Sequence, residues 1–131
     1  MDIPQNEKNE VLDFLGKKVV EFRDRNLQIS INYATGESNN AIKREMYNAL
    51  ADLTHEQRER VNDLLSETIT TTIYDFLEMF EENSEEMKII LTNDDKEYNM
   101  LDISEKMGSE IARYDESGWI QKFSKSGRFV L

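Results

Sequence analysis

The chain contains no cysteine, one histidine, one proline and five glycines among its 131 residues. Without cysteine it can form neither a disulfide framework nor a thiolate nucleophile. The single histidine, His55, cannot build a zinc site of several histidines or a nucleophile–base pair with a second histidine, so we expect it to be a solvated surface residue. No apolar run approaches the ~18–20 residues that cross a membrane, and residues 1–10 are too polar for a signal peptide. We therefore expect a soluble, cytoplasmic protein.

Basic residues are also in short supply. The chain has 16 Lys and Arg against 27 Asp and Glu, a net charge of −11, and most of the excess acid lies in residues 61–116. A nucleic-acid-binding protein needs a basic face to neutralise phosphates, and an anionic membrane surface would repel this chain. We therefore expect no direct binding to nucleic acid or membrane. A basic protein partner would instead be attracted, and the attraction would speed association.

Length and apolar content predict one folded domain over residues 1–131, because a quarter of the chain is Leu, Ile, Val or Phe. Apolar residues spaced by three and four predict helices over 7–25, 40–53 and 55–82. The last is the most strongly marked, because Thr54 and Gln57 form a T-x-x-Q capping box before it. Its apolar stripe comprises Val61, Leu64, Leu65, Ile69, Ile73, Phe76, Leu77 and Phe80.

Two features of the first predicted helix affect its interpretation. Gly16 lowers the helix propensity, and four cations, Lys17, Lys18, Arg23 and Arg25, lie towards its end, where positive charge suits the helix dipole. The following residues, Leu27 to Tyr33, alternate in polarity. They fit either a short strand or a continuation of the helix.

The C-terminal half has the character of strands. Residues 87–92 and 96–103 flank a short NDD turn and predict a hairpin. Ser104 can cap a short helix that ends near Tyr114, and residues 119–131 resemble a second hairpin that turns at SKSG. Helices followed by strands predict an α+β fold with N-terminal helices, a long central helix, a small antiparallel β region and a short helix.

The acidic residues near the end of the long helix are the candidate binding site. They are spaced by three and four residues and share one face if the helix continues through Glu86. This face is interpreted as a solvated surface, a surface for a basic protein or a cation site, and we take the second as the hypothesis. The predicted set adds the acids of the NDD turn and a nearby aromatic anchor: Asp75, Glu78, Glu82, Glu86, Asp94, Asp95 and Tyr98. No catalytic residue, metal ligand or cofactor is predicted, since the NDD turn lacks the calcium-loop pattern.

The basic, aromatic C-terminal segment allows two interpretations. Trp119 is either a core anchor or an interface residue, and the first is favoured for a lone tryptophan in a small domain. The bases Lys122, Lys125 and Arg128 are expected to offset acidic groups elsewhere in the same chain.

Three segments carry a resemblance: THEQRERVNDLLSETITTTIYDFLEMFEEN, KIILTNDD and GWIQKFSKSG. They resemble a group of small acidic bacterial proteins in which a long helix with an F-L-x-x-x-E-E-like end precedes a strand and a G-W-I segment. The likeness spans roughly residues 54–128. Such proteins are similar to the immunity proteins of bacterial toxin systems. The resemblance implies a binding protein and transfers no site residue.

The hypothesis from the sequence is a non-enzymatic immunity protein that inhibits a basic toxin, for example one of the nuclease type, through its acidic surface. An adaptor or regulatory subunit of a larger assembly is the alternative, and a large exposed apolar patch would favour it. A carboxylate- or metal-dependent enzyme is a third possibility.

Overall fold

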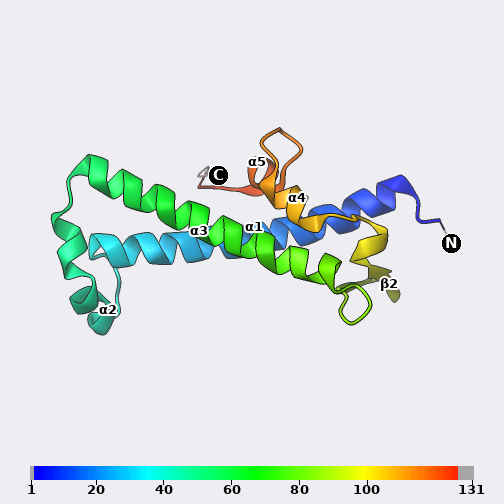
Figure 1. The fold of residues 1–131 in the computed structure, drawn as a ribbon, viewed down its shortest axis with the longest axis horizontal. Coiled ribbons are helices and arrows are strands. Elements are labelled where there is room, and N and C mark those ends of the chain that lie inside the picture. The colour runs from blue at the N-terminus through cyan, green and yellow to red at the C-terminus, as the bar shows by residue number, and fades with distance from the viewer. Residues whose placement is uncertain (1, 127–131) are drawn as a thin grey trace.

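The computed structural model describes residues 2–126, and two long antiparallel helices dominate it (Figure 1). Helix α1 spans Gln5–Thr35 and helix α3 spans His55–Glu82. At 1.5 Å per residue they are about 46 and about 42 Å long. They are joined at one end by a short helix, α2, over Ala41–Met46 and a 3₁₀ helix, η1, over Asn48–Asp52.

Helix α1 is longer than the predicted helix over 7–25, because it continues through the segment that the sequence left open. Leu27 and Ala34, seven residues apart, are both buried on one side of the helix. The helix ends at Gly36, which has a left-handed φ of 79° and donates its N–H to the carbonyl of Asn32. Glycine adopts this conformation without steric cost.

Helix α3 is confirmed at its predicted bounds, with the Thr54–Gln57 capping box formed in both directions. The single helix predicted over 40–53 is wrong, since α2 ends at Met46 and η1 follows. Neither element has a buried residue, and Ile42 and Met46 are exposed. The segment packs only lightly on the end of α1, where the Tyr47 ring stacks on that of Tyr33.

The predicted β-hairpin is confirmed but shorter. Strand β1 (Ile90–Asn93) pairs antiparallel with β2 (Lys96–Asn99). Asp94 and Asp95 form the two-residue turn, with φ values of 50° and 66°. Positive φ at both central residues defines the type I′ turn that suits the twist of a hairpin. A 3₁₀ helix, η2, follows over Met100–Asp102.

Two short helices, α4 (Met107–Ala112) and α5 (Trp119–Phe123), complete the fold. The prediction that Ser104 caps a helix is wrong, because the cap residue of α4 is Lys106 and the Ser104 hydroxyl donates to Glu110.

The C-terminal hairpin is also wrong, because residues 119–123 are helical and bury the neighbours Trp119 and Ile120 together. Successive residues of a strand would point to opposite faces. The end of that predicted hairpin, residues 127–131, lies outside the described residues.

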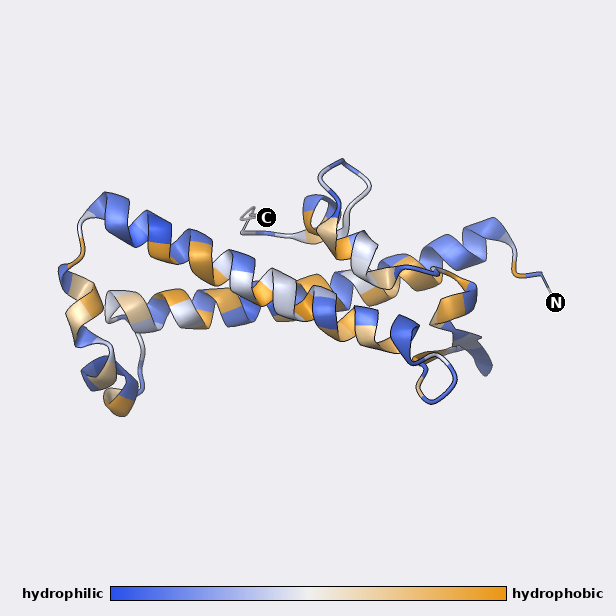
Figure 2. Cartoon of the chain, viewed as in Figure 1, coloured by the Kyte–Doolittle hydropathy of each residue, from blue (hydrophilic) through white to orange (hydrophobic). Residues whose placement is uncertain are grey.

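The core lies where α4, α5 and the β-hairpin pack against the two long helices. Its buried members include Trp119, which confirms the core interpretation of this residue; the others are Val11, Val20, Leu77, Tyr98, Met100, Met107, Ile111 and Ile120. Apolar residues recur in short patches along both long helices (Figure 2). No helix in residues 2–126 has the length and apolar content to cross a membrane. The arrangement confirms the α+β class.

Candidate functional site

Helix α3 ends, and the β-hairpin lies, at the end of the molecule opposite α2 (Figure 1), and both segments are rich in acidic residues. Five predicted site residues are exposed there, and we call them the acidic end: Asp75, Glu82, Glu86, Asp94 and Asp95. No Lys, Arg or His occurs between Val61 and Met87. The exposed carboxylates on this stretch of α3 therefore have no basic neighbour in sequence.

Glu86 reaches the acidic end from a turn and not from the helix face that the spacing implied. Helix α3 ends at Glu82, and the N–H groups of Glu86 and Met87 both donate to the carbonyl of Asn83 at 2.9 Å. The condition that the helix continues through Glu86 is therefore not met.

Glu78 lies on the side of α3 that packs on α4, and it is half-buried. A Cβ atom on Gly108 would lie 3.0 Å from Oε1 of Glu78 and 3.1 Å from the ring of Tyr74. The Glu78 carboxylate also raises the pKa of Tyr74. Glu78 is thus part of the α3–α4 contact and contributes less to the surface than its neighbours.

Glu81 belongs to the same contact and was missed by the sequence analysis. Its carboxylate faces the backbone N–H groups of Met107 and Gly108 at the start of α4, and its buried Oε1 has no hydrogen-bond partner among the described residues. Burial raises the pKa of Glu81, and the nearby Glu78 carboxylate raises it further. The sequence offers no signal for this role, since Glu81 is one of several acids in a run.

We expect Glu81→Gln to raise the melting temperature at pH 7 by a few degrees. Because the pKa of Glu81 is higher in the folded chain than in the unfolded chain, its contribution to stability is fully present below the unfolded pKa. That contribution is lost as the pH rises through the folded pKa. Between pH 4 and pH 8, the melting temperature should fall less in Glu81→Gln than in the wild type. The exposed Glu85→Gln is the control, and equal pH slopes in wild type and Glu81→Gln would contradict the assignment.

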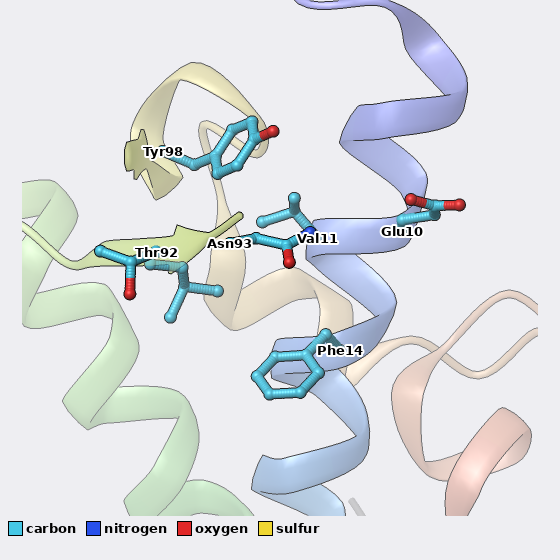
Figure 3. A pocket seen from close by; sticks show the side chains of 7 residues that line it. Glu10, Val11, Phe14, Thr92, Asn93 and Tyr98 are labelled. Atoms are coloured by element: carbon cyan, nitrogen blue, oxygen red, sulfur yellow. The ribbon is translucent and has the colours of Figure 1, made fainter. Parts of the chain in front are cut away.

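Tyr98 is only 4% exposed, so the structure places the predicted aromatic anchor in the core. Its ring points towards Val11 of α1 beside a pocket of about 170 Å³ (Figure 3). Its hydroxyl is hydrogen-bonded to Glu7, which also accepts from Nζ of Lys96 at 3.3 Å, and burial raises the pKa of Tyr98. Tyr98 therefore fastens the hairpin to α1. The pocket is smaller than the ~300 Å³ at which small-molecule sites begin.

A buried arginine is the second feature that the sequence did not indicate. Arg23 is fully buried, and it donates from Nε to Thr70 at 3.0 Å and from Nη2 to Ser66 at 2.8 Å. Its Nη1 lies 2.8 Å from Asp24, which in turn accepts from the Ser124 hydroxyl at 2.9 Å. The interpretation of Arg23 as a cation at a helix end is wrong, because α1 continues to Thr35. Burial lowers the pKa of Arg23, and Asp24 opposes that shift.

The C-terminal bases behave partly as expected. Nζ of Lys122 lies 2.6 Å from Asp13, which confirms an intramolecular role for this lysine. The backbone N–H of Lys125 donates to Asp24 at 2.8 Å. Arg128 lies outside the described residues.

A mostly apolar groove runs between α1 and α3. Its volume is about 490 Å³. Phe22 and Phe76 form its exposed rims, with 52% and 55% of their surfaces accessible. The lining also includes Leu15, Lys18, Val19, Thr72, Ile73, Leu77 and Ile89. On α3 these positions lie on a different side from Glu78 and Glu81, so α4 leaves the groove open.

The fold and its surface define a small α+β protein with an acidic end and an open apolar groove. Within residues 2–126, no group of three or more His, Cys, Asp or Glu side chains is arranged to hold a metal ion. No protein-family model matches the chain, and comparison with curated proteins and with solved structures found no match either.

Proposed function

We propose that this chain is a non-enzymatic cytoplasmic protein that binds a basic protein partner through its acidic end. The observation that carries the proposal is the exposure of Asp75, Glu82 and Glu86 along a stretch of 27 residues, 61–87, without a single base. Such a surface attracts a positively charged protein from a distance and raises the association rate.

The acidic end opposes local stability, which supports a role beyond solubility. Glu82 lies in the last turn of α3, which has no basic residue. A carboxylate there interacts unfavourably with the helix dipole, by about 0.3–1 kcal/mol. Asp94 and Asp95 occupy left-handed positions where a type I′ turn favours Asn-Gly or Asp-Gly. The last turn of α3 and the hairpin turn therefore both carry acidic residues at positions where other residue types would give a more stable fold.

In its specific form, the proposal is that the chain is an immunity protein for a nuclease-type toxin. Nucleases bind phosphates through basic grooves, and an acidic protein surface can occupy such a groove. The toxin part of the proposal rests on the resemblance of residues 54–128 to toxin-system immunity proteins. The charge distribution supports only the basic partner.

The test compares two charge reversals of equal size. Glu82→Lys with Glu86→Lys changes the acidic end, and Glu37→Lys with Glu45→Lys changes exposed residues near α2. Wild-type and variant chains are used to capture proteins from the native host's lysate, and association with the purified partner is followed by stopped flow. We expect the first variant to associate about tenfold or more slowly, in line with the range over which charge steers on-rates.

Three results would support the proposal together: a basic partner, a rate that falls with added salt, and loss of the partner's activity at equal stoichiometry. Equal association rates for the two variants would contradict the acidic end as the site. A basic partner that remains active in the complex would contradict inhibition but not binding.

The apolar groove favours a second candidate, an adaptor or subunit of a larger assembly, since exposed apolar surfaces mark interaction sites. Phe22→Asp separates the two functions. A partner bound through the groove should be retained by the wild-type chain at high salt and lost from Phe22→Asp. A partner bound through the acidic end should be captured equally by the wild type and by Phe22→Asp.

A further inference from the structure

We propose that a second copy of this chain covers the apolar groove, so that two helical hairpins pack face to face in a weak, symmetric dimer. This inference is independent of the acidic end. It concerns a surface that the fold leaves uncovered and that the proposed basic partner does not require.

The groove has the composition of an interface. Thr72 and Phe76 of its lining continue a row of exposed, uncharged residues that starts outside the groove at Leu64 and Thr68 and runs along α3 at four-residue steps. This row of exposed, uncharged side chains is about 18 Å long. Such a row stands out because 33% of the residues of the chain are charged. Depletion of charge with exposed aromatic residues is typical of the centre of protein interfaces.

The charges at the groove's edge favour this occupant over a basic protein. On the α1 side, Nζ of Lys18 lies 5.7 Å from the centre of the Phe14 ring, and the guanidinium of Arg25 lies 5.8 Å from that of Phe22. On the α3 side, the edge carries Asp75. A basic protein would meet these two cations, of which Lys18 also pairs with the exposed Glu21 of its own helix at 3.7 Å, whereas a second copy of the chain brings an acid, Asp75, to the matching edge.

The register of the two helices gives the pairing. Arg23 bonds to Ser66 and Thr70, so residue 23 of α1 is level with the residues near 68 of α3. Because the helices are antiparallel, Lys18 is level with residues near 73, beside Asp75. A two-fold axis parallel to the helices places each α1 over the α3 of the second copy at the same level. Each Lys18 then lies close to Asp75 of the other copy, and the interface is self-complementary.

The size of the surface predicts a weak dimer. From Phe14 to Ile29 the exposed face of α1 is about 22 Å long, and two helices side by side are about 20 Å wide. The footprint is therefore about 440 Å² per copy, or about 900 Å² in total, which is below the about 1,000 Å² of stable specific interfaces and in the range of weak, transient ones. A dissociation constant in the micromolar range is expected.

Sedimentation velocity over a wide concentration range tests the proposal, with salt at about 0.02 M and about 0.5 M to change the screening length. We expect dimer to accumulate with concentration and more readily at high salt, because two strongly acidic chains repel each other at low salt. Phe22→Asp and Phe76→Asp should each weaken the dimer at least about tenfold. Ile42→Asp, an exposed apolar residue on α2, is the matched control, and circular dichroism verifies that every variant is folded.

A charge swap tests the pairing. Lys18→Glu and Asp75→Lys should each weaken the dimer, and the double variant should restore it.

Disulfide cross-linking gives a second test of the pairing. Because the chain has no cysteine, mixing Phe22→Cys chains with Thr72→Cys chains should give mixed disulfides in preference to either homodimer. A wild-type chain that stays monomeric at all concentrations would overturn the proposal, as would a dimer that persists in both aspartate variants. Glu82→Lys with Glu86→Lys should leave the dimer intact, so failure here is distinct from failure of the proposed function.

Discussion

Replacing Arg23 with methionine is expected to lower the free energy of unfolding by about 3 kcal/mol. The guanidinium is fully buried, and all three of its nitrogens donate to side chains. Without it, the hydroxyls of Ser66 and Thr70 each lose a donor, and Asp24 loses one of its donors, at 2.8 Å. Urea denaturation followed by circular dichroism measures the change.

Arg25→Met is the matched control, since Arg25 is exposed two residues further along the same helix. It should change stability by about 0.5 kcal/mol or less. Adding Ser66→Ala and Thr70→Val to Arg23→Met should recover part of the loss, because removing both partners of a buried hydrogen bond leaves no unsatisfied group. If Arg23→Met cost no more than Arg25→Met, the buried cluster would not contribute to stability.

Gly16→Ala is expected to destabilise the protein by about 1–3 kcal/mol, although alanine is the better helix former by about 1 kcal/mol. A Cβ atom at this position would lie 2.5–2.6 Å from Nε1, Cδ1 and Cε2 of Trp119. The indole is 1% exposed, so a shift of the ring disturbs the packing of the core around it. Because Trp119 is the only tryptophan, its fluorescence reports both the unfolding transition and any displacement of the ring.

Lys17→Ala provides the comparison for Gly16→Ala, because Lys17 is exposed on the same turn and its replacement only raises helix propensity. In a Trp119→Leu background, Gly16→Ala should cost less than in the wild type. This difference is the coupling energy of the pair. A stabilising effect of Gly16→Ala in the wild-type background would contradict the close contact.

The sequence predicted α3 correctly because its signals are local. The capping box involves residues three apart, and the apolar stripe repeats within one helix. The same reasoning failed for residues 40–53 and 119–123, where the apolar spacing is short and the outcome depends on the elements that pack nearby. Residues 26–34 could not be assigned from the sequence, because their order fits both the alternating polarity of a strand and the helical spacing that buries Leu27 and Ala34.

The candidate site was predicted in part. The sequence identified the acids of the acidic end, and five of the six predicted acids are exposed. It could not separate Glu78 and Glu81, which contact α4, from Glu82, which faces solvent, because all three are carboxylates within one turn and a half. It assigned Tyr98 to the surface, since nothing local reveals that α1 passes over β2.

By itself the sequence determined the charge of this protein, the long helix α3 and the position of the hairpin turn, because these depend on composition and on residues a few positions apart. Only the tertiary structure decided that Arg23 is buried, that Gly16 accommodates an indole, and that Phe22 and Phe76 line an open groove. Each of these outcomes depends on contacts between residues about 50 to 100 positions apart. A side chain's surroundings are set by the elements that pack against it, and no local pattern encodes them.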